Sequence, residues 1–270
     1  MNTRSIFIAL LAASILASTI PTTVAAAPIK FTTSVKSSLD KTIAVANANQ
    51  ADKISSLYDQ LLTVQKQLQD WDVEIKELHT RNQDTLVALN KEIQQIDAES
   101  LDKLESEVTQ IRERYKALFS HYSSLNKQIE AARALKSKDL TNLFQFQVNL
   151  IKIPVQAARI NINTKENEWR AAKENAAKKK KELRGRLEEI TPVNLEIKNK
   201  RSAIKTNETD ITTVWNTFKQ AAKNNDPDTV LDTLASLISL SHQINEEKQV
   251  IFNLENKISH IISAAKAQMP

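Results

Sequence analysis

The sequence predicts an all-α protein, an elongated antiparallel coiled-coil bundle of about three long helices. Three observations support this fold class. The 270 residues include a single glycine, Gly185, and six prolines, so the residues that usually form turns are scarce. Apolar residues recur at alternating steps of three and four over long stretches. Only 5% of residues are aromatic, which favours narrow helix seams over a thick globular core. The scarcity of glycine also excludes the glycine-rich loops that bind nucleotides.

The N-terminal segment, residues 1–26, is interpreted as a signal peptide. Arg4 supplies a positive start, residues 5–20 are apolar, and a small-x-small pattern predicts cleavage after Ala26. The mature chain, residues 27–270, is therefore expected to be secreted and to form one elongated helical domain. It contains no cysteine, which excludes the disulfide-rich class of secreted domains.

The first helix is predicted over residues 36–138. Neither glycine nor proline occurs between Phe31 and Ile153, and two runs of apolar residues keep the 3.5-residue repeat of helices that pack knobs into holes. The first run is Ile54, Leu57, Leu61, Val64, Leu68, Trp71, Ile75 and Leu78, and the second is Leu101, Leu104, Val108, Ile111, Tyr115, Leu118, Tyr122, Leu125 and Ile129. Between the runs the pattern needs extra four-residue steps. The polar stretch 79–84 is open as continuous helix or as a break.

The second and third helices are predicted over residues 164–224 and 227–267. Pro192 interrupts the second helix, but the threonine before it can act as an N-cap, so we expect a bend there. A polar turn separates the two helices, and Asp226 is the predicted N-cap of the third. Three polar residues lie on the seam of the third helix and are candidates for fixing its register: Ser241, Lys248 and Glu255.

The connector between the first two helices, residues 140–163, is apolar and is open as a helix or as a strand-like hairpin, with an irregular loop as a further option. As a helix, it has a kink at Pro154 and one apolar face made of Leu140, Phe144, Val148, Ile151, Val155, Ala158 and Ile162. As a strand-like hairpin, it uses the alternation of apolar and polar residues in Phe144–Leu150 and Ile160–Asn163. In the second form it resembles the membrane-active tongue of helical pore-forming toxins found in some bacteria, which implies a membrane-inserting element.

In either form, the apolar tip is where a protein partner or a membrane surface is expected to dock. The candidate contact residues are Phe144, Phe146, Val148, Leu150, Ile151 and Ile153.

The net positive charge of the mature chain is concentrated between residues 139 and 190. The basic run there could bind anionic cell-wall polymers or acidic lipid headgroups. The run is also explained as a solvated helix face, because glutamates are interleaved with it and lysine and arginine are good helix formers. Binding to nucleic acid is not expected, since the chain is exported and the run lacks aromatic stacking residues. The candidate anion contacts are Lys178, Lys179, Lys180, Lys181, Arg184 and Arg186.

No catalytic, cofactor or metal site is predicted. The four histidines are scattered, and none has a second histidine three or four residues away. We therefore expect a secreted, non-enzymatic structural or binding protein of the cell envelope or extracellular space, with a protein or envelope-polymer partner and with self-association as a further option. The coiled-coil parts of secreted bacterial proteins that regulate peptidoglycan hydrolases are broadly similar in form. The alternatives are a membrane-active protein that uses residues 140–163 as its insertion element, and an exported chaperone.

Overall fold

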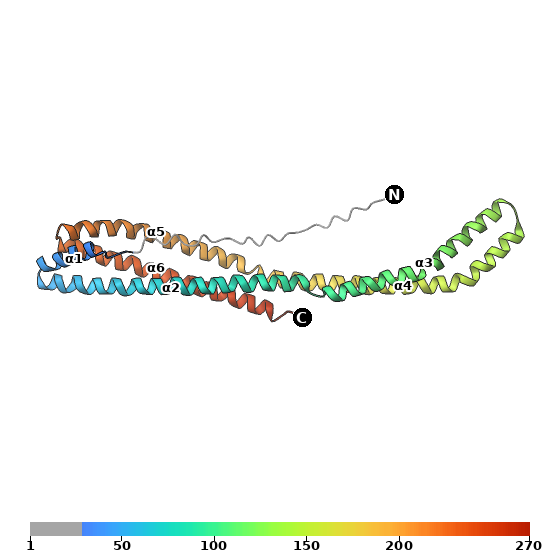
Figure 1. Ribbon diagram of the computed structural model, residues 1–270, viewed down its shortest axis with the longest axis horizontal. Coiled ribbons are helices and arrows are strands. Elements are labelled where there is room, and N and C mark those ends of the chain that lie inside the picture. Colours follow the sequence, from blue (N-terminus) through green and yellow to red (C-terminus); the bar gives the residue numbers. More distant parts are fainter. Residues whose placement is uncertain (1–28) are drawn as a thin grey trace. The chain divides into compact units, whose positions relative to one another are not determined.

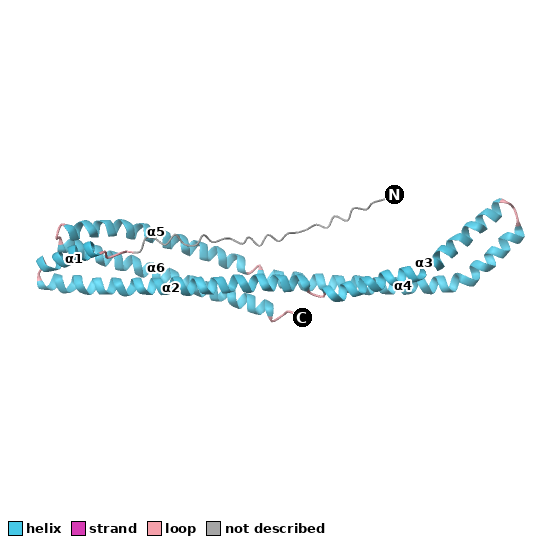
Figure 2. Ribbon diagram, in the orientation of Figure 1, coloured by secondary structure: helices cyan, strands magenta, loops and turns pink. Residues whose placement is uncertain are grey.

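The structure, a computed structural model, describes residues 29–270. Within these residues the chain forms six α-helices, which Figure 1 labels in order. Their bounds are α1 Thr33–Val45, α2 Ala48–Gln95, α3 Ala98–Ala134, α4 Lys138–Leu187, α5 Ile190–Lys223 and α6 Pro227–Lys266. None of the described residues is in a strand, which confirms the all-α prediction for this part of the chain (Figure 2). The predicted signal peptide lies outside the described residues.

The helix predicted over residues 36–138 is divided into α1, α2 and α3. The polar stretch 79–84 is continuous helix, and the chain leaves the helical conformation instead at Ile96 and Asp97, where Asp97 has a positive φ of 56°. The break falls where the apolar spacing lengthens to a step of five residues, from Ile96 to Leu101. An unbroken helix would rotate the following apolar residues away from the packed face.

The connector predicted over residues 140–163 is not a separate element, because it lies inside α4. The chain reverses earlier, at residues 135–137, where Lys136 has a φ of 52°. The Ser137 amide donates to the Ala132 carbonyl at 3.1 Å, which closes the C-terminal end of α3. The strand-like interpretation of this segment is therefore wrong.

The helical interpretation of the segment is correct because its apolar residues also recur at helical spacing, and one face of α4 packs against α3. Pro154 lies inside α4, and the helix continues on both sides of it. Further along, the helix predicted over residues 164–224 is divided between α4 and α5. Pro192 lies in the first turn of α5, where a missing backbone N–H leaves no helical hydrogen bond unmade.

The described chain divides into two compact units, each considered by itself. Unit 1 contains residues 29–72 and 199–249, and unit 2 contains residues 73–198 and 250–270. Helices α2, α5 and α6 contribute residues to both units. The single domain expected over residues 27–270 stays a prediction.

In unit 1, α2 and α6 run parallel to each other. Gln50 donates to Asp228 at 2.6 Å near the starts of the two helices, and further along the Lys248 ammonium donates to Asp72 at 2.6 Å and to the Leu68 carbonyl at 3.1 Å. Lys248 is buried, as its seam position predicted, and these bonds satisfy its charge. The core of the unit includes Leu39, Ile54, Leu61, Val64, Ile204, Ile211, Phe218, Val230, Leu234, Leu237 and Ile244.

In unit 2, α2 also packs against α6 through a buried polar cluster. The Glu255 carboxylate is completely buried, accepts a hydrogen bond from the Asn82 amide at 3.0 Å and lies 2.7 Å from Nδ1 of His79. These contacts explain why the polar stretch 79–84 remains helical, since its seam residue Asn82 has a buried polar partner rather than water. The α3–α4 hairpin belongs to the same unit, with Val108, Ile111, Leu125, Ile129, Val155, Ala158 and Leu183 among its buried residues.

The turn between α5 and α6 has the predicted capping residue. Asp226 accepts hydrogen bonds from the Thr229 hydroxyl at 2.7 Å and from the Thr229 amide at 3.2 Å, and these bonds hold the pKa of the Asp226 carboxyl below its ordinary value. Asn225 before it has a φ of 55°, a conformation that asparagine tolerates better than most residues. The predicted N-cap is confirmed.

This cap predicts a dependence of stability on pH. Because the pKa of Asp226 is lower in the folded chain, its stabilisation is complete above the unfolded pKa, near 4, and is lost as the pH falls through the folded pKa. Asp226→Asn keeps a capping oxygen that does not titrate. The free energy of unfolding of this variant, measured by urea titration with circular dichroism, should therefore fall less steeply below about pH 4 than that of the unmodified chain. Asp232→Asn, an exposed change on the same helix, should follow the unmodified chain. Equal slopes for all three proteins would contradict the assignment.

Candidate functional site

Helix α4 has an apolar stripe that lies outside the core of unit 2. Five large side chains in it are at least half exposed, namely Leu143 at 50%, Phe146 at 62%, Leu150 at 62%, Ile153 at 75% and Ile160 at 67%. The small residue Ala157, also exposed, completes the stripe. Successive members are three or four residues apart, so they lie on one side of the helix. We call this set of six residues the outer face.

The opposite side of α4, the inner face, packs against α3. Val155 and Ala158 are buried there, and Val148 shares a shallow hollow between the two helices with Ile129. Inner-face and outer-face positions, such as Phe144 and Phe146, are two residues apart, which is about 200° around the helix. The outer face therefore points away from α3.

Polar contacts between α3 and α4 hold the hairpin in register. Arg112 pairs with Glu166 at 2.6 Å, and the Asn161 amide donates to the Tyr115 hydroxyl at 3.2 Å. Lys165 donates to Glu168 on its own helix and to Glu107 on α3, and these hydrogen bonds raise the pKa of its ammonium group. The outer face is thus presented on a helix that is supported from behind.

The six residues predicted to contact a partner or a membrane do not form one surface. Phe146, Leu150 and Ile153 belong to the outer face, whereas Phe144, Val148 and Ile151 are half-buried on the inner face. The sequence interpretation also missed Leu143 and Ile160. Their spacing of three and four residues from the other members was the signal that could have identified them.

The positions that flank the outer face are uncharged. Between residues 140 and 164 the only charged side chains are Lys152 and Arg159, and neither occupies a position next to the stripe. Arg159 instead lies over the Tyr122 ring of α3, 6.0 Å from its centroid. The flanking residues are Asn142, Gln147, Asn149, Pro154, Gln156 and Asn161. The outer face is therefore an apolar stripe bordered mainly by amides.

The basic run of α4 has a structural role at two of its positions. Lys180 donates to the Gln94 carbonyl at 2.9 Å in the last turn of α2, and Lys179 pairs with Asp97 at 3.2 Å in the break between α2 and α3. A cation near the last carbonyls of a helix satisfies those groups and interacts favourably with the helix dipole. The other predicted anion contacts, Lys178, Lys181, Arg184 and Arg186, are exposed. Two of the six predicted anion contacts therefore bind groups of the chain itself, so not all of the positive charge of the run is available to an external anion.

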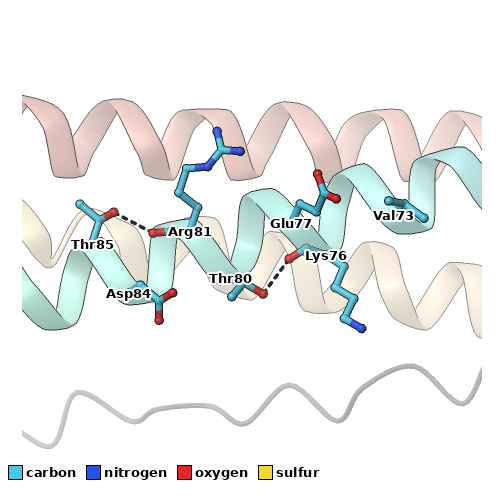
Figure 3. Close-up of a pocket in the computed structure, with 7 residues that line it drawn as sticks. All are labelled: Val73, Lys76, Glu77, Thr80, Arg81, Asp84 and Thr85. Atoms are coloured by element: carbon cyan, nitrogen blue, oxygen red, sulfur yellow. Dashed lines mark hydrogen bonds between the residues drawn. The ribbon is translucent and has the colours of Figure 1, made fainter.

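A shallow hollow lies along α2 in unit 2, and Figure 3 shows the residues that line it. All seven come from one stretch of this helix, between Val73 and Thr85, so no second element forms a wall. The hydroxyls of Thr80 and Thr85 donate to backbone carbonyls of α2 itself, and the charged side chains around them are of mixed sign. This hollow has no converging set of polar groups that would bind a ligand.

Two structural findings and the comparisons with known proteins bear on function. Among residues 29–270, no group of three or more His, Cys, Asp or Glu side chains is arranged to hold a metal ion. No helix within these residues combines the length and apolar character that crossing a bilayer requires. Comparisons with protein-family models, with curated proteins and with solved structures each gave no match. The function must therefore be argued from the chain's own surfaces.

Proposed function

We propose that the protein is a secreted, non-enzymatic structural or binding protein of the cell envelope or extracellular space, and that it binds a protein partner through the outer face of α4. The observation that supports this proposal is the exposure of five large apolar side chains in one stripe. Scattered exposed apolar residues are common on proteins, but a contiguous stripe of them is typical of an interaction surface.

The geometry of the outer face suits another helix. Residues spaced by three and four along one side of a helix can interdigitate with a matching stripe on a second helix. Because α3 supports α4 from the opposite side, the outer face is already in its binding conformation, and little conformational entropy is lost on association.

The same residues suit a membrane surface less well. Helices that lie on membranes usually have many lysines and arginines on the polar side, which attract acidic headgroups. Here the flanking positions have amides and a proline, and the segment from 140 to 164 contains only two basic residues. This composition favours a protein partner.

The test compares the mature chain, residues 27–270, with two triple variants. The outer-face variant carries Phe146→Gln, Leu150→Gln and Ile153→Gln. The control variant makes the same kind of change at three exposed apolar positions elsewhere in unit 2: Val73→Gln, Val87→Gln and Leu195→Gln. Each protein is sedimented with isolated cell envelopes and, separately, with liposomes. We expect the unmodified chain and the control variant to pellet with envelopes, and the outer-face variant to bind at least about tenfold more weakly.

Each of the other results would count against the proposal. If the unmodified chain stays in the supernatant with every envelope fraction, it is not an envelope-binding protein. If it pellets with liposomes and releases an enclosed dye, the membrane-active alternative replaces the proposal. If the two triple variants bind equally, the outer face is not the binding surface.

A further inference from the structure

The outer face of α4 has a spacing that is unchanged when the chain direction is reversed. Its positions 143, 146, 150, 153, 157 and 160 are separated by steps of three, four, three, four and three. A second copy of α4 that runs in the opposite direction therefore presents the same pattern, with the symmetry centre between residues 151 and 152. An odd number of alternating three- and four-residue steps always reads the same in both directions, so a two-fold axis at this centre can bring the same surface of both copies together, as an isologous dimer requires.

The side chains that this reversal would bring together are also complementary in size. Leu143 would lie opposite Ile160 of the second copy, and Leu150 opposite Ile153. The largest side chain, Phe146, would lie opposite the smallest, Ala157. A large residue opposite a small one fills the space between two helices without overpacking.

The charges of the segment also permit pairing between identical chains. Like charges beside a helix seam would repel each other in a homodimer. The six flanking positions are uncharged, and five of them have amides, which can both donate and accept hydrogen bonds. Charged side chains make up 26% of the protein, but none occupies these six flanking positions.

The exposed area is sufficient for a weak to moderate dimer. Five side chains that are 50–75% exposed present on the order of 600 Å² of apolar surface, the upper end of the patches found on monomers. Pairing two such faces would bury at most about 1,200 Å², the lower end for specific interfaces.

We infer that the outer face binds a second copy of this chain, as an antiparallel pair of α4 helices. This inference rests on the proposed function, because it identifies the protein partner of the same surface. A dimer would carry two copies of every other surface that binds the envelope. Avidity would then strengthen envelope binding, and changing the outer face would remove that gain because it would separate the two copies.

Sedimentation velocity of the purified mature chain tests the pairing in the absence of envelopes. The unmodified chain and the control variant should shift from monomer to dimer with rising concentration. The outer-face variant should have a dimer dissociation constant at least about 100-fold higher. Circular dichroism verifies that all three are equally helical. A monomeric unmodified chain at every concentration, or an outer-face variant that dimerises normally, would overturn the inference.

Cysteine cross-linking tests the direction of the pairing, because the chain has no cysteine of its own. Mixed Leu143→Cys and Ile160→Cys proteins should form a disulfide-linked dimer under mild oxidation. Leu143→Cys alone should not, since its two copies would be about 25 Å apart. Cross-linking of Leu143→Cys with itself and not with Ile160→Cys would indicate a parallel dimer and would overturn the antiparallel assignment.

The two proposals can fail separately. If the chain is a monomer that still binds envelopes through the outer face, the pairing of two copies is refuted and the proposed function is left intact. A dimer that binds no envelope fraction refutes the proposed function and leaves the pairing intact. Binding of the monomer to liposomes alone would assign the outer face to a lipid surface and overturn both.

Discussion

Replacing Phe218 with alanine will lower the free energy of unfolding by about 3–5 kcal/mol. The Phe218 side chain is completely buried in unit 1. Its ring stacks on Trp215 with the ring centroids 4.9 Å apart, and Phe31 meets it edge-on at 5.6 Å. Removing the ring takes away these contacts and leaves a cavity that the neighbouring helices cannot close without losing their own packing.

Phe146→Ala is the matched control, since it removes the same ring from the exposed outer face. In dilute protein, where any dimer is dissociated, it should change the free energy of unfolding by less than about 1 kcal/mol. Urea titration followed by circular dichroism measures both variants. Equal losses for the two would mean that Phe218 is not a core residue.

Asn82→Leu will also destabilise the protein, by about 2 kcal/mol, although it replaces a polar seam residue with an apolar one. The reason is Glu255, whose carboxylate is completely buried and would lose the hydrogen bond from the Asn82 amide. The amide also donates to the Glu255 backbone carbonyl at 2.8 Å, and that bond would be lost as well. A buried acceptor without its donor costs more than the added apolar contact contributes.

The double variant Asn82→Leu/Glu255→Leu should recover this loss and equal or exceed the stability of the unmodified chain. Replacing a buried polar or charged cluster entirely by apolar residues is often neutral or stabilising, because no group then remains desolvated. His79 is partly exposed and can then hydrogen-bond to water. Thermal and urea unfolding of the single and double variants would settle the point. A double variant less stable than Asn82→Leu would show that the cluster stabilises the fold.

Local features of the chain were largely predictable. The near absence of glycine and the three-and-four spacing predicted helices, and helices account for most of the described residues. Asp226 was identified as a cap because a short carboxylate before proline can accept from the first turn of a helix. Lys248 and Glu255 were identified as seam residues by their spacing, and both are buried with polar partners. In each case the signal that identified the residue is local, although the polar partners of Lys248 and Glu255 lie on α2.

The positions of the helix ends were less predictable, because they depend on contacts between distant residues. The break at Ile96 and Asp97 has no glycine or proline to mark it, and Lys179 and Lys180 contact it from more than 80 residues away. The chain reversal at residues 135–137 likewise uses Lys136 in a conformation that lysine rarely adopts. The lengthened apolar step from Ile96 to Leu101 was a local signal at the first site, but spacing alone did not distinguish a break from a continuous helix.

In the candidate site, too, some features follow from the sequence alone and others depend on contacts with distant residues. The sequence by itself determined that residues 140–163 are apolar and nearly free of charge, and that they fit a helix. The helical interpretation relied on the stripe that contains Val155, and the second stripe, which contains Leu150, was not identified as a face of its own. Only the tertiary structure decided that α3 covers the stripe containing Val155 and leaves the one containing Leu150 exposed. Spacing along a helix defines its faces, but which face is buried is decided by the surface that packs against it.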